Sequence, residues 1–170
     1  VQFHQAMQLA MQDSLTKLGN RRSFDEQIKR TMAQASRRHA RAGLILCDLN
    51  KFKAINDTFG HDIGDNVLIQ FAKALRKSVR DTDSVFRFGG DEFAIIVADA
   101  SEQSLAVIEH RVYLAMSKDA LLAKYNVTSS LGLAFMNRAD NASSFFKRAD
   151  KALYSQKMST PHKLSIVSQS

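Results

Sequence analysis

Asp48 stands where a carboxylate needs a partner. It follows the apolar run Gly43 to Cys47, which is typical of a buried strand, and a carboxylate at the exit of such a strand is costly to desolvate when unpaired. One natural partner is a hard cation such as Mg2+, which prefers oxygen ligands and binds together with substrate phosphates. The alternative is that Asp48 caps a following helix. Taken alone, the residue favours neither explanation.

A second acidic pair follows two glycines in the segment 87–93, which is typical of a tight hairpin. With Gly89-Gly90 as a two-residue turn, Arg87 lies opposite Glu92, so a cross-strand salt bridge explains Glu92. Asp91 then shares a face with phenylalanines, which favours Asp91 over Glu92 as a metal ligand. Acidic groups at a strand end and on an adjacent hairpin are the arrangement that two-metal phosphoryl transfer needs.

The segment 56–65 adds amide and carboxylate groups between turn glycines. Asn56 can donate and accept hydrogen bonds, and Asp65 can accept from the N1–H and exocyclic amine of a guanine. Asp65 has a second explanation as the N-cap of a helix over 65–80. These residues therefore suit a nucleotide base without requiring one.

Apolar periodicity predicts alternating helices and strands around this chemistry. The expected helices are 1–12, 23–40 with Ser23 as N-cap, 65–80, 103–123 and 142–157, with a polar loop before 65; the expected strands are 43–48, a hairpin within 86–97, and 127–135, with 162–167 as a candidate edge strand. Because one strand pair is a hairpin and the others alternate with helices, we expect an α+β domain with a mixed central β-sheet flanked by helices.

Composition limits the partners. The 170 residues suffice for one core, and 24 basic against 17 acidic residues give a net charge of +7. Zinc-ligand spacing, stacking aromatics and a recognition helix are missing from the sequence, so we expect no nucleic-acid binding. The single cysteine, Cys47, fits a reducing compartment, and no apolar run approaches the ~20 residues of a membrane span. We expect a cytoplasmic domain without direct membrane contact, with any anchor in upstream segments.

Five segments together resemble the GGDEF family of diguanylate cyclases in order and spacing. Gly89-Gly90-Asp91-Glu92-Phe93 resembles the motif that names the family. Residues 13–22 resemble D-x-L-T-G-L-x-N-R-R, and 48–65 resemble D-x-D-x-F-K-x-I-N-D-x-x-G-H-x-x-G-D. Residues 128–132 resemble T-x-S-x-G, and 148–154 resemble R-A-D-x-A-L-Y. The resemblance implies that 13–170 is a domain joining two GTP molecules into c-di-GMP, and that the helix 1–12 enters from an upstream domain.

For this family the resemblance implies a palm-like fold, related to nucleotide cyclases and polymerases, and a Mg2+ cofactor with Mn2+ as the alternative. Its implied metal ligands are Asp48, the backbone carbonyl of Leu49, and Asp91; Glu92 joins the catalytic residues. Each domain would carry half of an active site, so catalysis implies a homodimer in which each GTP 3′-hydroxyl attacks the other's α-phosphate.

The resemblance also assigns residues to the substrate. Backbone amides near Phe52 and Lys53, with the side chain of Lys157, would bind the triphosphate. Asn56 and Asp65 would recognise guanine.

A regulatory site is implied by Arg80-Asp81-Thr82-Asp83, which resembles the family's inhibitory R-x-x-D. Arg80 could bind guanine O6 and N7, Asp83 could accept from its N1–H and amine, and Arg111 could come from a neighbouring subunit to bind the product c-di-GMP. The alternative is a basic helix end followed by a solvated turn.

Three departures from the family pattern stand out. Asn50 replaces the second Asp of D-x-D, and Lys17 and Gly19 replace a Gly and a Pro far from the chemistry. Pro161 takes the place of an arginine that would assist Lys157 on the phosphates. This last change sustains one rival hypothesis, a weak or silent relative that senses GTP or c-di-GMP.

Overall fold

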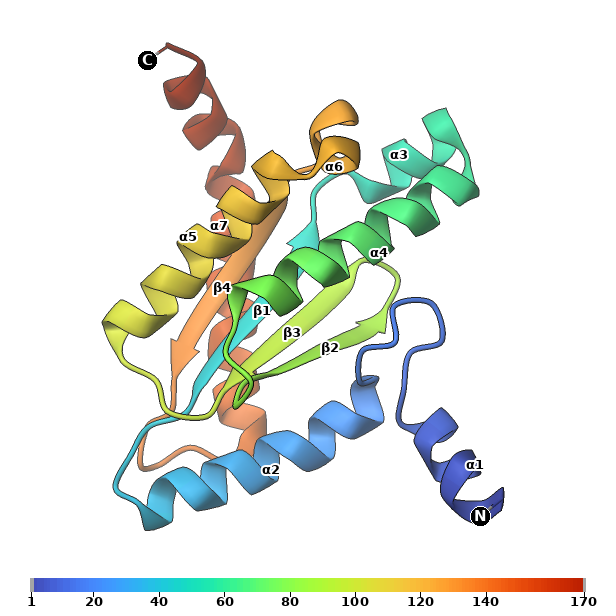
Figure 1. Ribbon diagram of the computed structural model, residues 1–170. Helices are drawn as coiled ribbons and strands as arrows, with labels where there is room; N and C mark the ends of the chain where they lie inside the picture. The colour runs from blue at the N-terminus through green and yellow to red at the C-terminus, as the bar shows by residue number, and fades with distance from the viewer. Residues whose placement is uncertain (1, 170) are drawn as a thin grey trace.

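The computed structural model describes residues 2–169, with side chains described except at 4, 7–9 and 160–169. A four-stranded sheet with the order β2-β3-β1-β4 forms its centre (Figure 1). The elements are, in chain order, α1 (Gln2–Ala10), α2 (Arg21–Arg37), β1 (Gly43–Leu49), α3 (Phe52–Phe59), α4 (His61–Ser78), β2 (Ser84–Gly89), β3 (Glu92–Val97), α5 (Glu102–Lys118), α6 (Ala120–Lys124), β4 (Ser129–Phe135) and α7 (Ala142–Gln169).

Every neighbouring pair in this sheet is antiparallel, so the expectation of a mixed sheet is wrong. The hairpin is the physical reason, because it inserts β3 between β1 and β2, while β1 separates β3 from β4. Each helical crossover thus joins two parallel strands that have an antiparallel strand between them. This is the split β-α-β-β-α-β arrangement.

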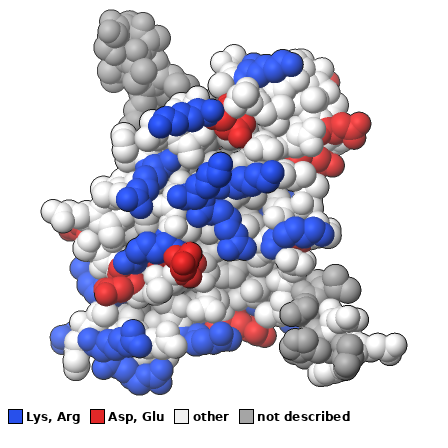
Figure 2. All heavy atoms as spheres, viewed as in Figure 1, with Lys and Arg blue, Asp and Glu red and all other residues white. Residues whose placement is uncertain are grey.

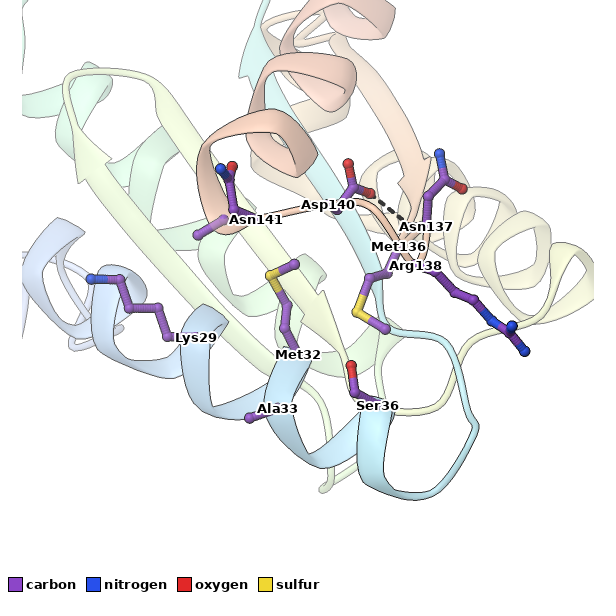
Figure 3. A pocket seen from close by; sticks show the side chains of 10 residues that line it. Lys29, Met32, Ala33, Ser36, Met136, Asn137, Arg138, Asp140 and Asn141 are labelled. Atoms are coloured by element: carbon purple, nitrogen blue, oxygen red, sulfur yellow. Dashed lines mark hydrogen bonds between the residues drawn. The ribbon is translucent and has the colours of Figure 1, made fainter.

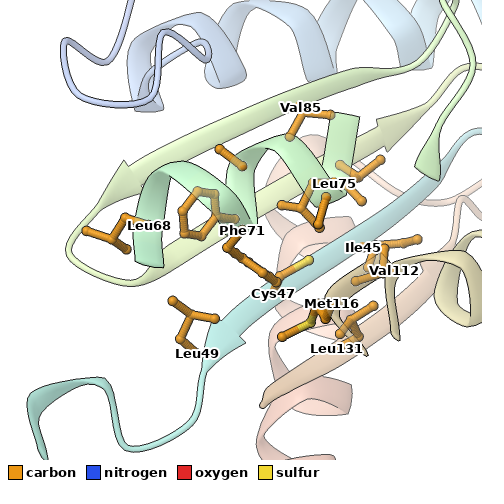
Figure 4. Close-up of a cluster of buried hydrophobic side chains, with 14 of the residues drawn as sticks. Ile45, Cys47, Leu49, Leu68, Phe71, Leu75, Val85, Val112, Met116 and Leu131 are labelled. Atoms are coloured by element: carbon orange, nitrogen blue, oxygen red, sulfur yellow. The ribbon is translucent and has the colours of Figure 1, made fainter. Parts of the chain in front are cut away.

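Helices cover both faces of the sheet, α4 and α5 on one and α2 and α7 on the other (Figure 1). In β1, Ile45, Cys47 and Leu49 pack with α4 and α5 (Figure 4), and Leu44 and Leu46 pack with α2 and α7. Because β1 is buried on both sides, it is apolar throughout until Asp48. By the same alternation, Asp48 shares the face that α7 covers.

Several expected boundaries change. Asn20 rather than Ser23 is the N-cap of α2, since its side chain accepts from the Ser23 N–H. The expected polar loop contains α3, and α4 begins at His61 with Gly60 as N-cap. Asp65 therefore lies inside α4, and its expected role as an N-cap is wrong.

The two ends of the chain are helical. The first helix, α1, lies within the range expected from periodicity. The last helix, α7, continues to Gln169, so the expected edge strand at 162–167 is part of this helix. No helix among residues 2–169 is long and apolar enough to span a membrane.

Candidate active site

Asp48, Asp91 and Lys157 meet at one end of the sheet, brought there by β1, the β2–β3 turn and α7. Lys157 Nζ lies 2.5 Å from Asp48 Oδ2. The Leu49 N–H donates to the backbone carbonyl of Asp91 at 3.3 Å, which ties the turn to the end of β1. Lys51 is the N-cap of α3, and no side chain caps that helix. Helix capping therefore does not account for Asp48.

The charges of this cluster fit a cation. Burial, followed by the hydrogen-bonding and charge of Asp48, raises the pKa of Asp91 to about 6, although Lys157 acts in the opposite direction. Asp48 Oδ1 is buried and has no hydrogen-bond partner in the described part of the chain. A divalent ion would satisfy this oxygen and relieve the repulsion between the carboxylates. Among the described residues no three acidic, histidine or cysteine side chains form a metal cluster, so such an ion would need backbone oxygen as well.

The hairpin differs from its predicted register by one residue. The turn is Gly90-Asp91, and Glu92 pairs with Gly89 rather than with Arg87. A bulge between Arg87 and Gly89 absorbs the difference. Gly89 and Gly90 have φ of +130° and +53°, a region that other residues adopt with strain.

The predicted salt bridge between Arg87 and Glu92 is therefore wrong. Arg87 instead binds Asp13 Oδ1 at 2.9 Å and donates twice to the Gly90 carbonyl, at 3.0 and 2.8 Å. Glu92 is exposed and lies opposite Asp48 across β1 and β3. Sequence reasoning missed Asp13 and Arg87 as the residues that hold the turn; the only signal was the position of Asp13 in the first family-like segment.

Asn50, the replacement in the D-x-D segment, hydrogen-bonds β4 and the residue that precedes it. Its Nδ2 donates to Thr128 Oγ1 at 3.1 Å, and its Oδ1 accepts from Ser130 Oγ at 2.9 Å. An amide makes both bonds, whereas a carboxylate could only accept. Asn50 thus fixes the chain as it leaves β1.

The start of α3 offers backbone donors close to this point. Lys51 adopts a left-handed conformation with φ of +55°, and the helix begins at Phe52 without a side-chain cap. The first N–H groups of a helix have no intrahelical acceptors and form a favourable site for anions. Phe52 and Lys53 supply the first two of them.

Asn56 and Asp65 are brought together by the contact between α3 and α4. A Cβ added to Gly64 would lie 1.7 Å from Asn56 Oδ1, so the amide rests directly on the backbone of α4. That oxygen is buried without a hydrogen-bond partner in the described part of the chain. Asp65, the next residue of α4, is exposed. The pair offers an unused acceptor beside an exposed carboxylate.

Arg80 and Asp83 form a local pair after α4. Asp83, whose side chain is fully buried, accepts from the Arg80 N–H at 3.0 Å, from its guanidinium at 3.3 Å, and from the Ala98 N–H at 3.3 Å. The Arg80 side chain is 50% exposed and also donates to the Asp99 carbonyl. Asp83 therefore positions Arg80, which is the half of the pair that solvent reaches.

Arg111 is exposed on α5 and lines a groove of about 450 Å³ against α4. Lys73, Lys77 and Lys118 line the same groove, and Lys and Arg side chains gather over this face of the molecule (Figure 2). A smaller pocket of about 230 Å³ lies between α2 and the loop after β4 (Figure 3). Neither of these two pockets includes Asp48, Asp91 or Lys157.

Comparison with known proteins identifies the family. The model of the family described as "Diguanylate cyclase, GGDEF domain" matches residues 10–162. The chain belongs to the GGDEF family. Diguanylate cyclase DgcS of Shewanella oneidensis is 36% identical over 159 residues, which cover 94% of this chain and 53% of DgcS. Diguanylate cyclase DosC of Escherichia coli K12 is 38% identical over 146 residues, 84% of this chain and 32% of DosC.

The fold agrees with a solved GGDEF structure. The coiled coil and GGDEF domain of DgcB from Caulobacter crescentus, in complex with c-di-GMP, matches with a TM-score of 0.85 at 29% identity, covering 92% of this chain and 85% of that one. The present chain spans about half the length of DgcS and a third of DosC. The α+β GGDEF fold is thereby confirmed, with its sheet antiparallel throughout.

Proposed function

We propose that this chain is the catalytic domain of a diguanylate cyclase, which condenses two GTP molecules into c-di-GMP and two pyrophosphates. Family membership supports the reaction class. The observation that carries the proposal is the meeting of Asp48, Asp91 and Lys157 where β1 and the glycine turn end. In this proposal residues 13–170 are the cyclase domain, and 1–12 are a linker helix that enters from an upstream domain.

Asp48 and Asp91 would hold the divalent ion with their carboxylates, together with the carbonyl of Leu49, and Glu92 would add negative charge beside Asp48. The ion is Mg2+, with Mn2+ as a substitute, and when bound it favours deprotonation of the attacking hydroxyl and neutralises the pyrophosphate. The lack of a hydrogen-bond partner for Asp48 Oδ1 in the described part of the chain supports this assignment.

The proposed substrate contacts come from α3, α4 and α7. The N–H groups of Phe52 and Lys53 and the ammonium of Lys157 would bind the triphosphate. Asn56 and Asp65 would hydrogen-bond the guanine edge; in support, the Asn56 amide oxygen has no hydrogen-bond partner in the described part of the chain. The side chains around Pro161 lie outside those described, so its effect stays a prediction.

Two domains would act together, each presenting one GTP to the other. The product would bind at Arg80, supported by Asp83 and by Arg111 of a neighbouring subunit, and would slow the reaction.

Incubation with GTP and Mg2+, followed by nucleotide chromatography, tests the proposal. We expect c-di-GMP to form at a rate that rises more steeply than in proportion to protein concentration. Asp48→Asn and Asp91→Asn should each abolish it while circular dichroism stays unchanged, and Asp99→Asn, an exposed carboxylate away from the site, should not. Binding of GTP without product by the unmodified domain would favour the silent relative instead.

A further inference from the structure

Lys157 sits on the carboxylate that the proposed metal ion would use. Its Nζ is 2.5 Å from Asp48 Oδ2, and the two side chains are 35% and 15% exposed. Partial burial weakens the screening that makes surface ion pairs so weak. The other oxygen of the same carboxylate is buried without a hydrogen-bond partner in the described part of the chain. The ammonium thus satisfies only half of Asp48.

One ammonium does not balance this cluster. Asp91 lies beside Asp48, because the Leu49 N–H donates to the Asp91 carbonyl at 3.3 Å, so two carboxylates share one ammonium. A compact divalent ion carries twice the charge and can bind oxygens of both residues. An ammonium and a divalent ion on one carboxylate would repel each other strongly at such short range.

We propose that Lys157 exchanges between two partners: it neutralises Asp48 in the metal-free domain, and it moves to the substrate triphosphate when a divalent ion replaces it. The lysine side chain has a flexible four-carbon stem, so its ammonium can change partners without movement of α7. This inference rests on the proposed cyclase function, because the second partner is the phosphate of GTP.

Exchange makes metal and nucleotide binding cooperative. Metal alone must displace Lys157, which leaves the ammonium without a carboxylate and lowers metal affinity. Metal together with GTP gives the displaced ammonium a phosphate, so each ligand favours the other by the same factor. A lysine that only binds phosphate and stays away from Asp48 would affect metal affinity much less in the absence of nucleotide, because repulsion between the two cations falls with distance.

Mn2+ binding without nucleotide, measured by electron paramagnetic resonance, separates these cases. We expect Lys157→Met to bind Mn2+ about tenfold more tightly than the unmodified domain, the lower end of couplings between close charge pairs. Lys151→Met is the matched control, because Lys151 is an exposed lysine on the same helix and its substitution removes the same charge. It should stay within about twofold. Equal or weaker Mn2+ binding by Lys157→Met would overturn the exchange.

Thermal unfolding gives a second readout on the same variants. In EDTA, Lys157→Met should melt below the unmodified domain because Asp48 has lost its partner, and saturating Mn2+ should raise its Tm by more. Lys157→Gln replaces it if the methionine variant does not fold. Neither measurement depends on turnover. If the unmodified domain forms no c-di-GMP, the proposed function alone is refuted. If it forms c-di-GMP normally but Lys157→Met and the unmodified domain bind Mn2+ with equal affinity, only the exchange is refuted.

Discussion

Arg87 ties Asp13, in the segment that enters the domain, to the turn that carries Asp91. Its guanidinium binds Asp13 Oδ1 at 2.9 Å and the Gly90 carbonyl at 3.0 and 2.8 Å. The Arg87 and Asp13 side chains are only 13% and 16% exposed. Because Gly90 precedes Asp91 directly, a shift of the entering segment would be transmitted through one side chain to Asp91, the proposed metal ligand. This pair is where a signal from α1 could reach the chemistry.

Asp13→Asn should destabilise the domain in a pH-dependent way. Burial raises the pKa of Asp13, but hydrogen bonds from Thr16 and the charge and hydrogen bond of Arg87 outweigh it and hold the pKa below its usual range. A lowered folded-state pKa means that the ionised carboxylate stabilises the fold above the unfolded pKa, and that this contribution disappears as pH falls through the folded one. We expect a loss of about 1–3 kcal/mol at pH 7 that shrinks toward pH 3.

Urea unfolding at several pH values measures this effect. Asp25→Asn is the control, because Asp25 pairs with Arg21 on the exposed surface of α2, where both side chains are about half exposed. A loss at Asp13→Asn that stays constant between pH 7 and pH 3 would show that the carboxylate charge has no role there.

Glu92→Gln should slow the enzyme without weakening the fold. Glu92 is exposed, makes no ion pair with Arg87, and lies directly opposite Asp48 in the antiparallel β1–β3 pair. Like charges in that position destabilise a sheet by ~0.2–1 kcal/mol, so removing one should leave Tm equal or slightly higher. If the charge serves cation binding, c-di-GMP synthesis should fall at least about tenfold.

Initial rates and thermal melts on Glu92→Gln and on Glu26→Gln, an exposed glutamate of α2, make the comparison. Full activity of Glu92→Gln would remove Glu92 from the catalytic residues. A marked fall in its Tm would instead indicate a structural partner.

Gly64→Ala should reduce guanine selectivity through Asn56. The added methyl would lie 1.7 Å from Asn56 Oδ1, so the amide must leave its place. A site built to hydrogen-bond a substrate rejects analogues that lack the groups, and it loses this discrimination when its own groups move. We expect KM for GTP to rise about tenfold or more, and the preference for GTP over ATP to fall, as for Asn56→Ala and Asp65→Ala.

Steady-state kinetics with GTP and ATP on Gly64→Ala and Asp62→Ala test this. Asp62 is an exposed carboxylate in the first turn of the same helix. Unchanged KM values in Gly64→Ala would mean that Asn56 does not contact the base. Comparable ATP and GTP rates in the unmodified domain would remove the guanine assignment altogether.

Features that depend on residues close together in the sequence were predictable from it. Asp48 is recognisable as a carboxylate that ends an apolar strand, and Gly89-Gly90 as a turn with positive φ. The register of that turn was not predictable. A turn at 89–90 and one at 90–91 both use the glycines, and the bulge after Arg87 that selects the second leaves no sequence pattern.

Long-range pairings were likewise hidden. A helix can connect two parallel strands that are neighbours in the sheet, or two parallel strands with an antiparallel strand between them. The order of elements along the chain is the same in both cases, so the antiparallel sheet could not be deduced from that order. The ion pair of Lys157 with Asp48 joins residues more than a hundred positions apart. The sequence predicts Glu92 as the partner of Arg87 only because a turn at Gly89-Gly90 would place the two residues opposite each other.

Arg80→Ala should remove product inhibition and leave the initial rate near normal. The Arg80 side chain is 50% exposed, and its guanidinium can bind guanine O6 and N7. Asp83 is less suitable for a substitution that tests the site, because its buried carboxylate accepts hydrogen bonds from the backbone N–H groups of Arg80 and Ala98. Its replacement would leave buried donors unsatisfied at a cost of about 1–3 kcal/mol.

The proposed inhibition at Arg80 would require coupling between two sites, since Arg80 follows α4 whereas the acidic cluster lies at the end of β1 and in the hairpin turn. Added c-di-GMP should therefore lower the maximal rate without competing directly with GTP. Isothermal titration of c-di-GMP, together with initial rates at several product concentrations, measures both parts. Arg76→Ala, an exposed arginine in the last turn of α4, is the control and should remain inhibited. If Arg80→Ala binds c-di-GMP with unchanged affinity, the Arg80–Asp83 pair is only the closure of a helix end, and the inhibitory site lies elsewhere.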